Sequence, residues 1–441
     1  MTEVLQKLEV SNVRRFKPYP AYKPSGVDWL GSIPEHWDVK KLRYVARLRS
    51  GDNITSEQFD DDGAYPVFGG NGVRGCSSHF THDGRFVLIG RQGALCGNVN
   101  YASGKFWASE HAVVVSPLTE FATVWMGELL RTMNLNQYSV SAAQPGLSVD
   151  AISALKIPVP PSSDQGAIAD FLDCETAKID ALILKKQTLI EKVQEKRSAL
   201  VSRTVTRGLP PDSARAAGLN PLPPIKASGI DWFGEVPAHW KEMMLKRAWA
   251  TADYGLSDAL TGDGPIKVLT MGNIQEGQVH LPENGALEEV EENMLVKDGD
   301  LLFNRTNSLA HVGKVGICRG IADERVTFAS YLVRIRTNRH ALPAFLNFLL
   351  NTPQQLAFLR CLALPSINQA NLNPTRYGQI RVFLPPIREQ QIIIDFLDQE
   401  TATLNDMVRK VGAAIARLEE YRATLISAAV TGKIDVRGVA A

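Results

Sequence analysis

The sequence lacks the features that mark secreted and membrane proteins. Its 441 residues include five cysteines, Cys76, Cys96, Cys174, Cys318 and Cys361, an odd number with no C-x-x-C pair. That spacing argues against a disulfide framework and against a structural zinc site. No apolar run approaches the roughly 20 residues of a membrane-spanning helix, and the N-terminus has no signal-peptide core. We therefore expect a cytoplasmic protein with reduced thiols, no metal and no membrane contact.

A surplus of charge of one sign is also missing. The 48 Lys and Arg residues balance 47 Asp and Glu residues, for a net charge of +1. A protein that binds nucleic acid unaided usually carries a basic surplus. DNA binding by this chain would therefore require basic groups gathered on one face, or phosphate contacts made by partner subunits.

The motifs of self-sufficient enzymes are absent as well. There is no G-x-x-x-x-G-K-[ST] loop for nucleotide hydrolysis, and the glycine-rich turn 68–72 lacks the strand, helix and downstream acid of a cofactor site. A methylase would need an N-P-P-[FY]-like loop, but Asn373-Pro374-Thr375-Arg376 lacks the second proline and the aromatic residue. The sequence thus predicts no catalytic residue and no cofactor of its own.

What the sequence does contain is a duplication. The segment SGVDWLGSIPEHW at 25–37 returns as SGIDWFGEVPAHW at 228–240, and the Pro-Pro, Gln, Phe-Leu-Asp and Glu-Thr elements of 160–176 return at 385–401. His36 and His239 recur with their tryptophans, so we expect them to pack the start of each unit, with Asp28 and Asp231 orienting the same turn. We call these repeated opening and closing segments the frame. Because the frame is kept while the sequence between its segments diverges, the two units should have similar functions on two different targets.

The repeat sets the predicted domain organisation. We expect two globular units, a helix after each unit, a connector rich in Pro, Ala and Gly, and a short tail. The corresponding ranges are 1–160 for the first globular domain, 161–208 for the first helix, 209–227 for the linker, 228–386 for the second globular domain, 387–434 for the second helix and 435–441 for the tail.

Each helical segment shows apolar residues at heptad spacing. The residues predicted to pair the helices are Leu172, Ile179, Leu182, Leu189, Val193, Leu397, Leu404, Met407, Val411 and Leu418. Ser162 and Gln165 have the spacing of a capping box, and Gly208 and Gly432 suit helix ends that follow Val-Thr pairs. A helix of about 35–40 residues cannot bury its stripe alone. We expect the two helices to pack antiparallel around a pseudo-two-fold axis; packing of each helix on its own domain is the alternative.

The globular units have the pattern of mixed α+β domains. Short β-branched runs, 86–89 and 113–115 in the first unit and 266–269 and 331–335 in the second, alternate with Gly- and Asn-rich turns. Helical stretches near 121–135 and 343–360 come late in each unit.

Polar loops occur at comparable positions in both units. Arg can make two hydrogen bonds to guanine, and Asn or Gln to adenine, so these side chains on loops suit base reading, although solvated turns have the same composition. The candidate base readers are Asn71, Arg74, Arg91, Gln92 and Gln144 in the first half, and Arg305, Asn307, Asn368, Gln369 and Asn371 in the second.

The S-G-x-D-W-x-G-x-x-P-x-H-W opening, the P-P-x-x-x-Q-x-x-I-x-x-F-L-D-x-E-T segment and the duplication resemble the specificity subunit of type I restriction–modification systems. The resemblance covers nearly all of the chain. It implies two target-recognition domains that each read one half of an interrupted, asymmetric site in double-stranded DNA. It also implies antiparallel helices that set the gap and dock two methyltransferase (modification) subunits, joined by restriction subunits that translocate DNA. S-adenosylmethionine, ATP and Mg²⁺ would then belong to the partner subunits only.

Two other classes of function remain as alternatives. A coiled-coil adaptor with protein-binding ends would show no salt-sensitive affinity for DNA, whereas DNA binding weakens steeply with salt. A self-sufficient nuclease or methylase is disfavoured by the missing motifs, and methyl transfer by the purified chain alone would revive it.

Overall fold

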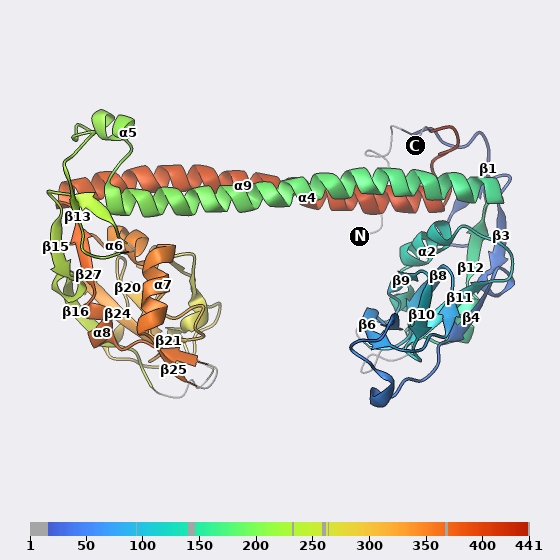
Figure 1. The fold of residues 1–441 in the computed structure, drawn as a ribbon, viewed down its shortest axis with the longest axis horizontal. Coiled ribbons are helices and arrows are strands. Elements are labelled where there is room, and N and C mark those ends of the chain that lie inside the picture. Colours follow the sequence, from blue (N-terminus) through green and yellow to red (C-terminus); the bar gives the residue numbers. More distant parts are fainter. Residues whose placement is uncertain are drawn as a thin grey trace. The chain divides into compact units, whose positions relative to one another are not determined.

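The computed structural model describes residues 16–93, 95–139, 146–231, 233–257, 262, 264–366 and 369–439. The chain divides into two compact units: the first contains residues up to Gln187 and from Gly412 onward, and the second runs from Thr188 to Val411. Each unit therefore combines one globular region with parts of both long helices, α4 (Ser162–Arg207) and α9 (Ile387–Val430) (Figure 1). No helix in the described part of the chain is long and apolar enough to cross a membrane.

The first unit is built on a sheet with strand order β4-β11-β8-β9 and a second sheet with order β6-β5-β10-β7. Two short pairs, β1-β2 and β3-β12, complete it. The strands are β1 (Tyr22–Pro24), β2 (Ser32–Pro34), β3 (Asp38–Lys41), β4 (Ala46–Ser50), β5 (Tyr65–Gly69), β6 (Gly72–Ser77), β7 (His82–Asp83), β8 (Phe86–Gly90), β9 (Val99–Ala102), β10 (Lys105–Ala108), β11 (Ala112–Pro117) and β12 (Lys156–Val159). The helices are α2 (Thr123–Thr132), which contacts β8 and β9, and α3 (Val149–Ser153).

The second unit has a main sheet of order β16-β24-β20-β22-β19-β18, a small sheet of order β21-β26-β25, and the pairs β13-β14, β15-β27 and β17-β23. Its strands are β13 (Ile225–Ala227), β14 (Glu235–Pro237), β15 (Lys241–Met244), β16 (Trp249–Tyr254), β17 (Lys267–Leu269), β18 (Ile274–Gln275), β19 (Gln278–Val279), β20 (Leu301–Asn304), β21 (Thr306–Asn307), β22 (Val315–Ile317), β23 (Val326–Phe328), β24 (Leu332–Thr337), β25 (Leu364–Ser366), β26 (Gln369–Asn371) and β27 (Arg381–Leu384). Its helices are α5 (Pro211–Ala216), α6 (Pro343–Leu350), α7 (Pro353–Leu362) and α8 (Pro374–Gly378).

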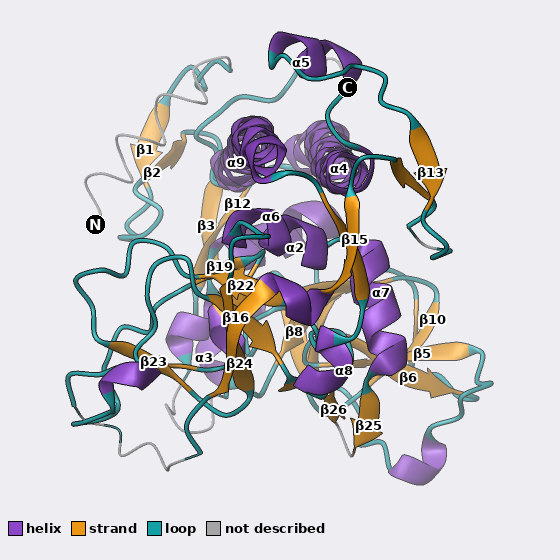
Figure 2. Cartoon of the chain, turned by 90° about the vertical axis from the view of Figure 1, so that its left-hand side faces the viewer, coloured by secondary structure: helices purple, strands orange, loops and turns teal. Residues whose placement is uncertain are grey.

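Both units thus consist of a run of strands followed by a few helices late in the unit, which confirms the predicted α+β class (Figure 2). Two expectations need correction. The helical stretch predicted near 343–360 is two helices, because Pro353 has no N–H to continue α6 and instead starts α7. The segment predicted as a linker contains α5, which starts at Pro211 and buries Ala214.

The two units share one topology despite their divergent sequences. The order β4-β11-β8-β9 corresponds to β16-β24-β20-β22, and all neighbouring strands in these series are antiparallel. The one parallel pair of the first unit's described strands, β5 with β10, corresponds to β17 with β23. The register therefore assigns counterparts to the residues that pair in the shared strands β4, β11 and β8 of the first unit and β16, β24 and β20 of the second.

The repeated sequence frame joins each unit to the start of a long helix. His36 Nε2 lies 2.8 Å from Asp164 Oδ2, and the buried Trp37 donates its Nε1–H to the same oxygen at 3.2 Å. Asp164 is the third residue of α4. The second copy repeats the arrangement with a longer acid: His239 Nε2 and Trp240 Nε1 lie 2.8 and 3.0 Å from the Glu389 carboxylate. This confirms that both histidines are frame residues.

Two local predictions about this frame are wrong. Gln165 does not form the predicted capping box with Ser162; it is buried, accepts from the Ala122 N–H at 3.1 Å and donates to the Pro160 carbonyl at 2.9 Å. Asp28 is exposed, and Ser25 holds the turn instead through the N–H and carbonyl of Val27. In both cases a tertiary or shorter-range partner outcompetes the bond inferred from spacing.

The long helices run antiparallel. In the first unit the early part of α4 packs with the late part of α9: Asp180 binds Arg422 at 2.9 Å, and Ile179 and Leu425 share one hydrophobic core. In the second unit the late part of α4 packs with the early part of α9, and Val205 shares a core with Leu397. The helices also contribute to the globular cores, so each helix both pairs with its repeat and packs on its own unit.

The predicted seam is only partly buried. Leu172, Ile179, Val193, Leu397 and Leu404 are buried, and Val411 and Leu418 are half-buried. In contrast, Leu182, Leu189 and Met407 keep 47%, 43% and 43% of their surface exposed. Leu172, Ile179 and Leu397 belong to the globular cores, whereas Val193 and Leu404 are buried without belonging to either core cluster.

Candidate nucleic-acid interface

The polar loops of each unit meet at the end of its central strand. In the first unit, Arg91 follows β8; its N–H donates to the His111 carbonyl and its own carbonyl accepts from the Leu147 N–H, both at 2.9 Å. In the second unit, Arg305 follows β20 and makes the same two backbone bonds, with Tyr331 at 3.0 Å and Leu372 at 2.9 Å. Arg91 and Arg305 are therefore structural counterparts. We call the surroundings of each arginine the reading corner.

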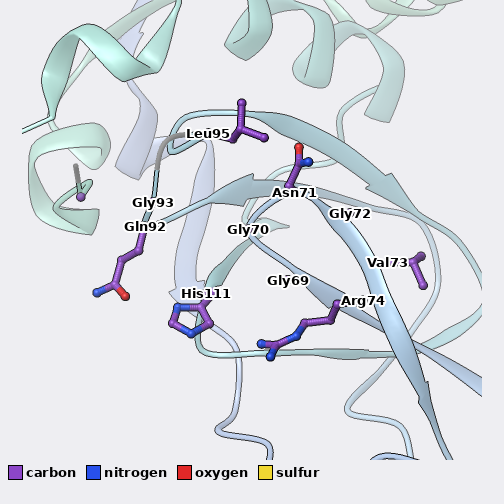
Figure 3. A pocket seen from close by; sticks show the side chains of 11 residues that line it. Gly69, Gly70, Asn71, Gly72, Val73, Arg74, Gln92, Gly93, Leu95 and His111 are labelled. Carbon is purple, nitrogen blue, oxygen red and sulfur yellow. The ribbon is translucent and has the colours of Figure 1, made fainter. Parts of the chain in front are cut away.

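The first reading corner is an open hollow of about 750 Å³ (Figure 3). It is lined by three of the predicted residues, Asn71, Arg74 and Gln92, together with His111. Asn71 sits in the two-residue loop between β5 and β6, and its Oδ1 accepts from Asn98 at 2.6 Å. The exposed Arg74 guanidinium lies 5.3 Å from the centre of the Phe59 ring. The hollow thus presents amide, guanidinium and imidazole groups from three separate segments.

Glycines allow these segments to come close. A Cβ at Gly90 would lie 2.1 Å from the Gly70 carbonyl oxygen, so only glycine lets the β5–β6 turn rest against the end of β8. Gly72, with φ of +97°, closes the same turn. Gly72 and Gly90 are therefore structural requirements of the hollow.

The second reading corner is a small sheet. Strand β21 pairs antiparallel with β26, which places Thr306 opposite Asn371 and Asn307 opposite Ala370. Asn371 donates its side-chain N–H to the Thr306 hydroxyl at 3.1 Å, and Gln369 is exposed at the turn between β25 and β26. The structure therefore brings together Arg305, Asn307, Gln369 and Asn371, which are separated by more than sixty residues in sequence.

The two arginines are held by their own units. Arg91 donates to the Ser50 hydroxyl at 3.2 Å. Arg305 stacks over the ring of Tyr254 at 5.3 Å and donates to the Ser330 carbonyl at 3.3 Å, while its Nε is buried without a partner among the described residues. Ser50 and Tyr254 are themselves counterparts, since each is the last residue of its edge strand. The guanidinium groups therefore fix each corner to the edge strand.

Two predicted readers, Gln144 and Asn368, lie outside the described residues. Sequence reasoning missed His111, Ser50 and Tyr254, which enter the corners through contacts between distant strands. The sequence did contain a signal for Tyr254, because a glycine follows it directly, as Gly51 follows Ser50 at the end of the other edge strand. Both glycines are required, since a Cβ at either would lie 2.1–2.3 Å from a backbone carbonyl oxygen.

Comparison with known proteins gives the family. Residues 34–193 and 253–415 match the model of the type I restriction modification DNA specificity domain, which together is more than half of the chain. The chain belongs to this family of type I restriction–modification specificity proteins. The match occurs twice, once on each globular region, in agreement with the duplicated topology.

The relatives are specificity subunits. The type I restriction enzyme EcoprrI specificity subunit of Escherichia coli is 46% identical over 138 residues, which are 30% of this chain and 34% of that protein. The EcoKI specificity subunit of Escherichia coli strain K12 is 23% identical over 317 residues, 69% of this chain and 64% of that protein. The matches thus span less than two thirds of either relative.

The fold also has a solved counterpart. A structure from work on complex assembly and conformational transition of the type I R-M system superposes with a TM-score of 0.61 at 15% identity, covering 90% of this chain and 98% of that chain. At this identity the likeness concerns the fold, which is that of the family.

Proposed function

We propose that this chain is the DNA sequence-specificity subunit of a type I restriction–modification complex, and that each globular unit reads one half of a bipartite, asymmetric site. The observation that carries the proposal is the repeated reading corner. Arg91 and Arg305 hold equivalent backbone positions, and each is surrounded by Asn and Gln side chains that suit hydrogen bonding to base edges. Because the side chains differ between corners, the two half-sites would differ in sequence.

In this proposal the chain recognises DNA and does no chemistry. Base readers would be the side chains around each corner, with phosphate contacts fixing the position of the duplex. Methyl transfer with S-adenosylmethionine, and ATP- and Mg²⁺-dependent translocation and cleavage, would belong to two modification subunits and to restriction subunits.

The long helices would set the gap between half-sites and dock the modification subunits. The half-exposed apolar side chains of Leu182, Leu189 and Met407 support docking, since such residues on a helix favour burial against a partner.

The experiment is a genome-wide methylation map by long-read sequencing of cells with and without the chain, both expressing the modification subunit. Loss of one interrupted, asymmetric methylated motif on deletion is the expected result and gives the target sequence. An unchanged map with both proteins expressed would contradict the proposal, and a pull-down of partners would then test the adaptor alternative.

A further inference from the structure

The edge strand of the first unit carries two arginines on one face. Arg47 and Arg49 alternate with Leu48 along β4, so their side chains leave the strand on the same side, and both are exposed. Strand β4 lies at the edge of its sheet, with β11 as its only partner there. Within the described residues, neither guanidinium forms an ion pair.

More cations lie on the strand pair β3–β12 and in the turn between β3 and β4. Lys41 on β3 lies directly opposite Lys156 on β12, a like-charged cross-strand pair that destabilises a sheet by itself. Neither lysine has an acidic partner among the described residues. Arg43, in the turn between β3 and β4, is exposed and lies 5.1 Å from the centre of the exposed Tyr44 ring. We call Lys41, Arg43, Arg47, Arg49 and Lys156 the basic strip.

The fold does not require these charges. In the second unit, Thr251 and Asp253 occupy the register positions of Arg47 and Arg49, and Asp253 binds Arg334 at 2.7 Å.

The lysine pair is likewise replaced. Met244 lies opposite Arg381, which is neutralised by Glu242 at 2.9 Å. The same topology therefore forms without the cations of β4 and without the unpaired lysine pair; the turn position of Arg43 keeps a basic counterpart, Lys246.

Along β4 the strip ends next to the reading corner, while the side chains of Arg49 and Ser50 leave β4 on opposite faces. Ser50, the residue after Arg49, accepts the hydrogen bond from Arg91. Arg47 and Arg49 are two residues apart on β4, roughly 7 Å, a separation over which two long side chains reach neighbouring phosphates of one DNA strand. Unpaired guanidinium groups at this spacing are suited to phosphate oxygens.

We propose that the basic strip binds the phosphate backbone of duplex DNA beside the first half-site, so that the first unit anchors the duplex while the second reads without such an anchor. This rests on the proposed function and adds the surface that makes sequence-independent contact. It also explains how a chain with a net charge of +1 offers a DNA-binding face.

The test measures the salt dependence of DNA binding by the full-length chain, with a mixed-sequence 30-base-pair duplex as probe. The slope of log K against log salt concentration is negative, and each lost phosphate contact reduces its magnitude by about 0.9. The double variant Arg47→Gln/Arg49→Gln should therefore reduce the magnitude of the slope by about two. Arg47→Lys/Arg49→Lys should retain it, because a phosphate accepts either cation.

The matched control is Arg409→Gln/Lys410→Gln, which removes the same charge from exposed positions on α9 that pair with Asp406. A slope for Arg47→Gln/Arg49→Gln equal to that of the control, with unchanged thermal melting, would overturn the strip while leaving the proposed function intact. If the wild-type chain shows no salt-dependent affinity for the duplex, the basic strip is refuted, and the methylation map tests the proposed function separately.

Discussion

At the scale of single residues, the arginine of each reading corner has a positioning task. The Arg305 guanidinium is held between the Tyr254 ring and the Ser330 carbonyl, so it has limited freedom to form a two-bond contact with guanine. The neighbouring Asn307 and Gln369 lie on the strands that the arginine backbone supports. Base reading by Arg305 stays a prediction, and the contacts show in addition that its guanidinium ties the corner to the edge strand.

Replacing Arg305 by alanine should weaken recognition of the second half-site only. Loss of the stacking and of the Ser330 bond displaces the β21–β26 ribbon, and a misplaced base contact costs about 1–3 kcal/mol of discrimination. Binding is measured on duplexes carrying substitutions in either half-site. Arg91→Ala is the matched variant and should affect the first half-site only; equal loss at both half-sites from Arg305→Ala would refute the assignment.

At the scale of elements, the same sheet is held by different chemistry in the two units. In the second unit the buried Asp300 binds Arg336 at 2.8 Å and lies 3.9 Å from the buried Arg334, which crosses to Asp253 on β16. In the first unit the counterpart of Arg334 is the buried Val114, which packs in an apolar cluster with Phe68 and Phe106. The two units therefore share the pairing register of their strands, although the residues buried between the strands differ in type.

Asp300→Ala should destabilise the second unit by about 1–3 kcal/mol, because it removes the buried acceptor of Arg336 and of the Lys297 N–H while Arg334 keeps Asp253. Chemical unfolding followed by tryptophan fluorescence measures the effect. Asp406→Ala removes a carboxylate from a solvent-screened ion pair on α9 and should change stability far less. Similar losses for the two variants would mean that the buried network contributes little.

The helices offer a second test at this scale. One heptad inserted after Leu182 in α4, with another before Leu418 in α9, keeps the seam in phase and lengthens the pair by about 10 Å. If the helices set the gap, the preferred spacer should grow by roughly 3 base pairs, at about 3.4 Å per pair. A methylation map reports the spacer directly, and an unchanged spacer would show that the helices do not determine it.

At the scale of the whole molecule, the first unit is discontinuous in sequence. After α9 the chain returns to the frame at the other end of the sequence: Lys433 donates to the carbonyls of Leu30 and Ser32 at 2.9 and 2.7 Å, and Ile434 and Val436 enter the first unit's core. The last residues of the second helical segment therefore complete the fold of the first unit.

Truncation after Val430 should destabilise the first unit by about 3–6 kcal/mol, since two fully buried aliphatic side chains contribute about 1.5–3 kcal/mol each. The second unit should keep its stability. Hydrogen exchange resolved by peptide separates the two effects. Removing only the residues after Gly438 is the control and should change neither unit; loss of protection in the second unit after the longer truncation would contradict the division.

The sequence by itself determined the features that rest on local patterns. The duplication, the α+β class and the helix ends before Gly208 and Gly432 follow from repeats, periodicity and the positive φ that glycine accepts at a helix end.

Tertiary structure decided the rest, because it depends on contacts between distant segments. Only the sheet register made Arg91 the counterpart of Arg305 and placed Arg47 where the other unit has Thr251. Only packing turned Gln165 from the predicted cap to Ala122 and Pro160, and left Leu182 exposed on a stripe that its spacing alone would bury. The spacing of residues determines which side chains lie on the same face of a helix or strand. The fold determines which other segment packs against that face.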